Sequence, residues 1–341
     1  MKERKEDKIH HIKPEISMVR SILYIIIGVV LLKLGGDLVV DEASELALIF
    51  GISERVIGLT IVAIGTSMPE LVVSLNSATN GYSDLSLGNV IGSNLVNLLL
   101  ILGVCAIIKP LPFTKGSIKF EIPFSIAITV LLFFFCINGS NDTQNIIIRP
   151  EGIFLIILCI LFILYNFRVS KQSKELYEDN LPAKIDENEF SILKSLGFIL
   201  IGILGLKFGG DFVVNGSIAI ATILGISEKL IGLTIVALGT SLPELFTSIV
   251  ATRKGETDIA IGNILGSQIF NILLILGISS IICPIHYSVS YNKDLILLII
   301  SSGLLALYPF IGMKNHMTRG NGILFVSIYA IYLITLIAFD G

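Results

Sequence analysis

The 341-residue sequence has no tryptophan, only four cysteines and four histidines, and few charged residues, which make up 15% of the chain. The cysteines show no CxxC or Cys/His spacing and the histidines are scattered, so neither a zinc site nor a histidine proton relay is indicated. The scarcity of charge, together with 53% hydrophobic residues and a mean hydropathy of +0.87, argues against a soluble protein. The composition therefore predicts an integral membrane protein.

The sequence contains many long apolar stretches. Ten of them are long enough to cross a bilayer core of about 30 Å as a helix. They lie near residues 19–41, 56–79, 85–108, 119–138, 151–167, 194–217, 230–252, 259–284, 292–312 and 321–339. The first is not a signal peptide, because its end, LKLGGDLVV, recurs in mid-chain as LKFGGDFVV. We therefore expect an all-α integral membrane protein with ten transmembrane helices.

The second half of the chain repeats the first, 174 residues later. GISERVIGLTIVAIGTSMPE at 51–70 recurs as GISEKLIGLTIVALGTSLPE at 225–244, and SLGNVIGSNLVNLLLILG recurs as AIGNILGSQIFNILLILG. Because five spans is an odd number, the second repeat enters the membrane from the opposite side, which gives two inverted five-helix repeats. The predicted domains are a polar N-terminal tail (1–18), the first repeat (19–167), a polar linker (168–193) and the second repeat (194–341).

The distribution of Lys and Arg predicts the orientation in the cell membrane, since cytoplasmic loops are enriched in these residues. With the N-terminus outside, thirteen Lys and Arg residues fall in inner loops and three in outer loops. The six basic residues of the N-terminal region oppose this choice, because they would then lie outside. The loop count favours an outside N-terminus and a cytoplasmic linker.

A proline lies in the middle of two predicted membrane helices, Pro69 in the second and Pro243 in the seventh. Proline removes a backbone hydrogen bond and clashes with the carbonyl four residues back, so both helices should break there. A freed carbonyl is costly in hydrocarbon unless it faces protein or a hydrated cavity. Broken helices at mid-membrane are typical of transporters, in which such carbonyls coordinate an ion.

A glutamate follows each proline, Glu70 in the first repeat and Glu244 in the second. An ionisable group at the centre of a membrane helix costs about 2.5 to 3.5 kcal/mol, so such groups tend to mark ion or substrate pathways. A protonated or helix-capping glutamate is the structural alternative. Hydroxyl residues three and four positions before each glutamate argue against it, because that spacing places their oxygens on the same helix face. These residues are Thr66, Ser67, Thr240 and Ser241.

The third helix of each repeat carries a polar stripe with a spacing of four residues. The stripes are Asn89, Ser93 and Asn97 in the first repeat, and Asn263, Ser267 and Asn271 in the second. Alone, such a stripe would suit hydrogen bonding between helices. Beside the glutamate helices, we expect the serine and the last asparagine of each stripe to be ligands, and Asn89 and Asn263 to serve packing.

Carboxylates, amides, hydroxyls and backbone carbonyls form an all-oxygen set that suits hard cations such as Na⁺ and Ca²⁺. Two ionised glutamates would neutralise one Ca²⁺ or two Na⁺, so competition for shared ligands would couple the two ions. These residues predict a cation antiporter and no enzyme, with no covalent chemistry and no organic cofactor. They do not choose the transported ions.

The motifs GTSMPE with GNVIGSNLVN, and GTSLPE with GNILGSQIFN, closely resemble the two alpha repeats of the sodium/calcium exchangers. The resemblance covers residues 32–103 and 206–277 and implies exchange of Na⁺ for Ca²⁺ by alternating access. It makes Glu70 and Glu244 the central Ca²⁺ ligands, shared with Na⁺. The other ligands that it implies are Thr66 and Thr240, then Ser67, Ser93, Ser241, Ser267 and the carbonyls of Ala63 and Ala237 around flanking Na⁺ sites, and Asn97 and Asn271 at the middle site. Na⁺, Ca²⁺ and the lipid bilayer are the implied partners, without nucleic acid or a protein partner.

Two positions depart from the family pattern. Asn271 stands where the potassium-dependent branch carries Asp, so K⁺ cotransport is not supported. Gln268 stands where the motif usually has Asn, as at Asn94 in the first repeat, and this position is expected to affect packing.

Three questions remain open at this stage. A Ca²⁺/H⁺ antiporter is the nearest alternative function, because a buried glutamate can alternate between proton and metal. A passive cation channel is a further alternative. Lys33 with Asp37, and Lys207 with Asp211, form i,i+4 pairs that suit either snorkelling lysines or a role in moving first and sixth helices.

Overall fold

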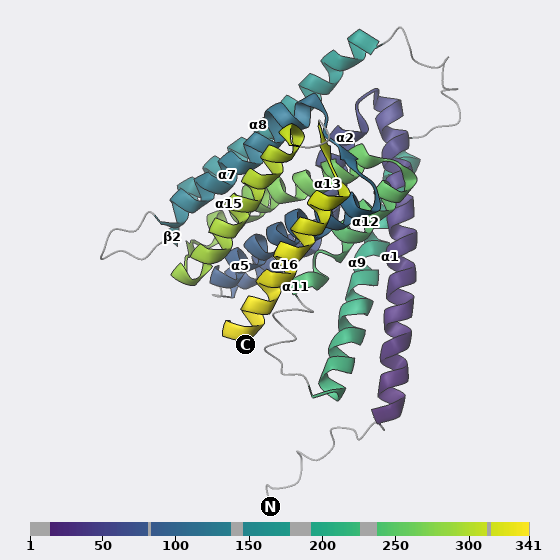
Figure 1. Ribbon diagram of the computed structural model, residues 1–341, viewed down its shortest axis with the longest axis vertical. Helices are drawn as coiled ribbons and strands as arrows, with labels where there is room; N and C mark the ends of the chain where they lie inside the picture. The colour runs from purple at the N-terminus through teal and green to yellow at the C-terminus, as the bar shows by residue number, and fades with distance from the viewer. Residues whose placement is uncertain are drawn as a thin grey trace, which may run out of the picture.

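The computed structural model describes residues 14–80, 83–137, 146–177, 192–225, 237–311 and 315–340, and these ranges are mainly helical (Figure 1). The helices of the first repeat are α1 (Pro14–Phe50), α2 (Glu54–Ile57), α3 (Ala63–Thr66), α4 (Met68–Thr79), α5 (Ser83–Leu95), α6 (Leu102–Ile108), α7 (Ile122–Cys136) and α8 (Arg149–Tyr177). Those of the second are α9 (Ile192–Ile223), α11 (Ala237–Gly239), α12 (Leu242–Lys254), α13 (Thr257–Phe270), α14 (Gly277–Ile282), α15 (Asn292–Leu307) and α16 (Arg319–Asp340).

Short elements interrupt or join these helices. Turns of π-helix lie at η1 (Gly58–Val62), η2 (Val96–Ile101), η3 (Ser117–Glu121) and η6 (Asn271–Leu276), and 3₁₀ turns at η7 (Val289–Tyr291) and η8 (Tyr308–Phe310). The strands are β1 (Leu111–Pro112), β2 (Ile146–Ile147), β3 (Ile285–His286) and β4 (His316–Met317). β1 pairs antiparallel with β4, and β2 with β3, so each two-stranded ribbon joins one repeat to the other.

The described residues contain eight helices long and apolar enough to cross a membrane, and the bent pair Glu54–Thr66 and Met68–Thr79 makes a ninth. The predicted helical membrane fold is confirmed. The predicted seventh span, 230–252, lies partly outside the described residues, and α11 and α12 are its described part.

Helices α1, α8 and α9 continue beyond the spans predicted from hydropathy, and α8 reaches Tyr177, within the predicted linker. α1 reaches Phe50 and α9 reaches Ile223, because helix formation does not stop at the polar residues that follow the apolar stretch. A glycine ends α1 and another ends α9. Gly51 has a φ of 58° and Gly225 a φ of 75°, a left-handed conformation in which glycine is favoured.

Both predicted helix breaks are confirmed. In the first repeat α3 and α4 are bent by 46° about Ser67, which has a φ of −83° and a ψ of 9°. In the second repeat Ser241 has nearly the same conformation, with a φ of −90° and a ψ of 7°. Pro69 and Pro243 each lie in the first turn of the new helix, where a missing backbone N–H costs nothing.

α1 and α9 form an antiparallel pair along one side of the bundle (Figure 1). Glycines bring their backbones together: a Cβ added at Gly28 would lie 2.6 Å from the Gly209 carbonyl oxygen. A Cβ added at Gly35 would lie 2.7 Å from the Gly202 carbonyl oxygen. Gly35 and Gly209 therefore serve close contact between α1 and α9, one of the roles expected of small residues in membrane helices.

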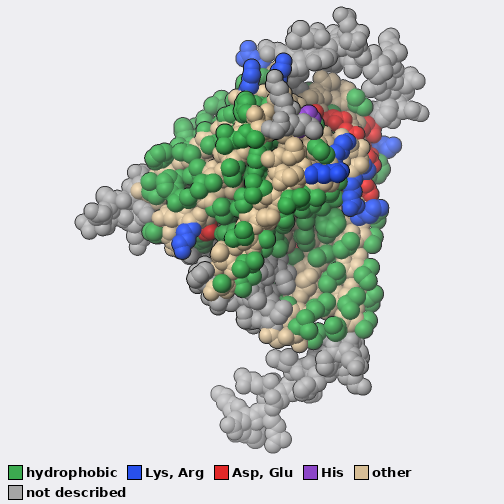
Figure 2. Space-filling model, in the orientation of Figure 1, with side chains coloured by type: hydrophobic (Ala, Val, Ile, Leu, Met, Phe, Trp, Pro, Cys, Tyr) green, Lys and Arg blue, Asp and Glu red, His purple; other side chains and the backbone are tan. Residues whose placement is uncertain are grey.

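The third helix of each repeat lies at the centre of the bundle. In the third helices, 72% of the most apolar 18-residue stretch of Ser86–Ile108 is buried, and 83% of that of Thr257–Ile282. The corresponding share in Met18–Phe50 is 28%. Hydrophobic side chains cover the flank formed by α1 and α9, while charged side chains gather near the end of α1 (Figure 2). The polar stripes are thus on the least exposed helices, and the α1–α9 pair lies at the periphery.

Candidate ion-binding site

The two helix breaks bring one carboxylate of each repeat into the protein interior. Glu70 lies in the first turn of α4 and is 1% exposed, and Glu244 lies in the first turn of α12 and is 0% exposed. The partial positive charge of a helix N-terminus favours a carboxylate at both positions. The breaks therefore supply both the location of each glutamate and part of its electrostatic stabilisation.

Each glutamate accepts a hydrogen bond from the broken helix of the other repeat. The Ser67 hydroxyl donates to Glu244 Oε1 at 2.8 Å, and the symmetry-related Ser241 hydroxyl donates to Glu70 Oε1 at 3.2 Å. Ser93 also donates to Glu70 Oε1, at 3.4 Å. The two half-sites thus form one site, in which hydroxyls from one repeat surround the carboxylate of the other.

The threonines complete this exchange between the repeats. Thr240 lies beside Glu70, and Thr66 lies beside Glu244 together with Ser267. The Thr66 hydroxyl is also 3.1 Å from Asn263 Oδ1 and 3.4 Å from the Ala63 carbonyl oxygen. In the second repeat, the backbone carbonyl that was predicted to be a Na⁺ ligand is that of Ala237, the first residue of α11.

Several buried oxygens of this site have no hydrogen-bond partner among the described residues. They are Glu70 Oε2, Glu244 Oε2, Thr240 Oγ1, Ser267 Oγ, Asn97 Oδ1 and Asn271 Oδ1. Leaving one buried polar atom unsatisfied costs about 1 to 3 kcal/mol, and more if it is charged, so a ligand bound by these oxygens would stabilise the site. Six together, all oxygens and two of them from carboxylates, have the donor chemistry of a site for Na⁺ or Ca²⁺.

Asn89 and Asn263 hold the third helix of each repeat against the broken helix. The Asn89 amide donates to the Glu70 carbonyl at 3.3 Å and to Ser74 Oγ at 3.0 Å. Asn263 makes the equivalent bonds to the Glu244 carbonyl at 3.4 Å and to the symmetry-related serine, Ser248, at 3.0 Å. Their donor groups are therefore engaged in holding the backbone that carries the carboxylates.

Asn97 and Asn271 lie in π-helical turns, at η2 and at the first residue of η6. A π-helical turn changes the register of side chains, so regular helical spacing does not describe these positions. The sequence predicted a packing role at position 268, but the Oδ1 of its first-repeat counterpart, Asn94, accepts a hydrogen bond from Asn271 Nδ2 at 3.0 Å. Gln268, at the same place in the second repeat, instead donates to Ser302 at 3.2 Å.

This difference makes the two asparagines of the site inequivalent. Asn94 holds the Asn271 amide so that its oxygen is left unpaired, whereas neither amide atom of Asn97 has a partner among the described residues. Sequence reasoning missed the effect, although the Asn-to-Gln difference at position 268 was the signal for it.

A buried ion pair outside the site was also missed. Arg55 Nε lies 3.0 Å from Glu121 Oε1, and their side chains are only 14% and 2% exposed. No motif links two residues so far apart in sequence, so only the packed structure reveals the pair.

The family model described as sodium/calcium exchanger protein matches residues 20–168 and 194–338, which is most of the chain. The chain belongs to the sodium/calcium exchanger family. Members of this family are transporters and not enzymes, and Na⁺ and Ca²⁺ are their substrates.

Relatives of the exchanger align along nearly its whole length. Sodium/calcium exchanger MaX1 of Methanosarcina acetivorans is 31% identical over 353 residues, covering 93% of this chain and 98% of the relative. Putative antiporter CaxA of Alkalimonas amylolytica is 34% identical, covering 92% and 98%. Inner membrane protein YrbG of Escherichia coli is 33% identical, covering 93% and 96%.

Solved structures of an exchanger have the same fold. The sodium-calcium exchanger NCX_Mj, soaked with Na⁺ and Sr²⁺, matches with a TM-score of 0.79 and 32% sequence identity. The match covers 94% of this chain and 99% of NCX_Mj. The present protein is therefore a multi-pass membrane exchanger.

Proposed function

We propose that the protein exchanges Na⁺ for Ca²⁺ across the cell membrane by alternating access. The cluster of buried, unpaired oxygens around Glu70 and Glu244 carries this proposal, because it offers hard ligands where the two repeats meet. The family membership supports the choice of ions.

Charge supplies the coupling in this proposal. Two ionised glutamates neutralise one Ca²⁺, whereas three Na⁺ ions would leave a net charge of +1 on the site. Na⁺ and Ca²⁺ would compete for the same carboxylate oxygens, so Na⁺ entry would expel Ca²⁺. Exchange at that ratio would be electrogenic, and the reversal potential of the exchange current measures the ratio directly.

The remaining predicted ligands have proposed places around this centre. The donors of the flanking Na⁺ sites are the hydroxyls of Ser67, Ser93, Ser241 and Ser267 with the carbonyls of Ala63 and Ala237. Thr66 and Thr240 would join the glutamates at the Ca²⁺ position, and Asn97 and Asn271 would face the middle site.

Reconstitution into proteoliposomes tests the function. With Na⁺ inside and ⁴⁵Ca²⁺ outside, the outward Na⁺ gradient should drive Ca²⁺ uptake, and equal Na⁺ on both sides should abolish it. Glu244→Gln should remove uptake because the site loses half of its charge. Lys33→Ala is the control and should leave much of the uptake, since the Lys33 side chain is 71% exposed whereas both glutamates are buried. Absence of Na⁺-driven uptake by folded protein would refute the proposal.

The same vesicles separate the alternatives. Uptake driven by a pH gradient in Na⁺-free buffer would indicate a Ca²⁺/H⁺ antiporter. Ca²⁺ flux that needs no counter-ion gradient would indicate a channel. The site favours Na⁺ over H⁺ as the counter-ion because serine hydroxyls surround the carboxylates, and hydroxyls coordinate Na⁺ but do not titrate.

We further propose that the N-terminus is outside and that the linker, residues 168–193, is cytoplasmic. This topology rests on the excess of Lys and Arg in the inner loops. Protease added to intact cells should leave the linker uncut, and protease added to inverted membrane vesicles should cut it. Cleavage in intact cells would reverse the assignment.

A further inference from the structure

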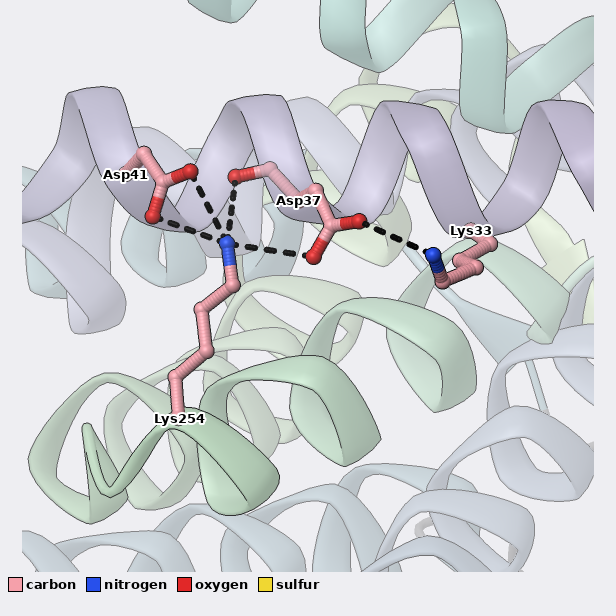
Figure 3. A network of polar contacts seen from close by, with 4 residues as sticks. All are labelled: Lys33, Asp37, Asp41 and Lys254. Atoms are coloured by element: carbon pink, nitrogen blue, oxygen red, sulfur yellow. Dashed lines mark hydrogen bonds and ion pairs between the residues drawn. The ribbon is translucent and has the colours of Figure 1, made fainter.

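A charge network ties the second half of α1 to the end of α12 (Figure 3). Lys254, the last residue of α12, has its Nζ 2.8 and 2.9 Å from the two carboxylate oxygens of Asp41. The same Nζ lies 3.1 Å from Asp37 Oδ1 and 3.4 Å from the Asp37 carbonyl oxygen. Lys33 approaches the other oxygen of Asp37 at 3.8 Å. One ammonium group therefore holds two carboxylates on successive turns of α1.

The repeat symmetry predicts a second network at the opposite end, but the residues for it are missing. The 174-residue offset places Asn80 opposite Lys254 and Asn215 opposite Asp41. Asn80 donates at 2.7 Å to a carbonyl of its own helix. Of the two acids, only Asp211 is retained. The charge network is therefore encoded in one repeat only.

The two ends also differ in packing. α1 packs on α12 at the network, whereas the corresponding face of α9, with Asp211 and Asn215, lines a cleft of about 330 Å³. The cleft runs between α9 and α4 and reaches Pro69 and Thr240 at the helix breaks. Of two symmetry-related side chains, Val73 at the cleft is 39% exposed and Thr247 is 0% exposed.

The network and the cleft are far apart along the α1–α9 pair. A Cβ at Gly216, next to Asn215, would lie 2.7 Å from the Ser21 carbonyl and 2.8 Å from Ile25, so this part of α9 is level with the start of α1. Asp41 lies on the order of 25 Å further along α1, at a rise of about 1.5 Å per residue. The structure is thus closed at the end that carries the network and open at the other.

We propose that Lys254 is a positioning residue that latches α1 to α12 and so favours the state in which the cleft beside α9 is open. The inference rests on the proposed alternating access, because the α1–α9 pair must move to open the other end. In the opposite state α9 would close on α4, where Asn80 and Asn215 offer no ion pair. With the proposed topology, the latch is cytoplasmic and favours the outward-facing state.

Thiol labelling measures the two states separately. Labelling of Val73→Cys measures how often the cleft beside α9 is open. Labelling of Thr247→Cys, at the symmetry-related position, measures how often the end that carries the network is open. Cys283→Ser removes the one native cysteine that is not fully buried among the four. A membrane-impermeant maleimide is applied from each side of the vesicle in turn, without ions, so that neither the topology nor the transported ions are assumed.

Lys254→Ala should raise the labelling rate at position 247 by about five- to tenfold, the effect of losing an exposed lysine that bridges two carboxylates. Lys254→Arg should restore the slow rate. Arg253→Ala is the matched control, since it removes the neighbouring charge of the same helix end. An unchanged rate with Lys254→Ala, or an equal rise with Arg253→Ala, would overturn the proposal.

A second variant builds the latch at the other end. Asn80→Lys with Asn215→Asp should raise labelling at position 247 and lower it at position 73, because the opposite state then gains an ion pair. Labelling unchanged at both positions would contradict the latch. Na⁺-driven Ca²⁺ uptake is measured in the same vesicles, so loss of the proposed transport with intact labelling changes would refute the function and not the latch.

Discussion

The contact between α1 and α9 depends on glycine, and Gly209→Ala tests it. A Cβ at Gly209 would lie 2.8 Å from the Gly28 carbonyl oxygen and 2.8 Å from the Leu32 nitrogen, both backbone atoms that cannot turn aside. To reach an ordinary contact the helices must separate by roughly 0.6 Å, which weakens their packing along the pair. Overpacking of this kind costs about 1 to 3 kcal/mol.

Gly205→Ala is the matched control on the same helix. Its added Cβ would lie 3.6 Å from the nearest atom, the Gly35 Cα, which is ordinary contact. Both substitutions gain the same helix propensity, about 1 kcal/mol for alanine over glycine, so this gain cancels in the comparison. The difference between the two variants therefore measures the close contact alone.

The assay is thermal unfolding of the two variants in the same detergent. A difference of 1 to 3 kcal/mol corresponds to roughly 2 to 6 °C in Tm, with Gly209→Ala the lower. Exchange in proteoliposomes should also be slower for Gly209→Ala than for Gly205→Ala. Equal Tm values, or a higher Tm for Gly209→Ala, would refute the inference that backbone contact at these glycines holds the pair together.

Three further predictions concern single side chains. Glu70→Gln should abolish Na⁺-driven ⁴⁵Ca²⁺ uptake while leaving the protein folded, since losing one carboxylate from such a site should cost at least about 1.4 kcal/mol of binding free energy. Retention of more than about a tenth of the uptake would contradict the assignment of Glu70 to the site. Asn94→Ala should raise the KM for Ca²⁺ severalfold with little change in Tm, because Asn271 loses the group that orients its amide; an unchanged KM would show that this orientation does not matter. Glu121→Gln should lower stability by about 3 to 5 kcal/mol, because Arg55 stays buried without its counter-charge, and a Tm equal to that of the parent would exclude a structural role for the pair.

Much of the fold could be predicted from the sequence because membrane helices carry a local signal. Each span is a continuous apolar stretch, and Pro69 and Pro243 mark the two breaks through the hydrogen bond that each removes. The ends of α1 and α9 could not be placed, since hydropathy reports the hydrocarbon boundary and not the end of the helix. The π-helical turns at Asn97 and Asn271 left no signal in the regular spacing.

The sequence by itself determined that this protein is a membrane exchanger with two related halves and a glutamate beside each break, because composition, proline and repetition are properties of the chain alone. Only the tertiary structure decided that Ser67 and Ser241 each bond the carboxylate of the other repeat, and that Lys254 reaches across to α1. Such contacts join residues more than 170 positions apart. They depend on how the two halves pack against each other, which the spacing of residues within either half does not specify.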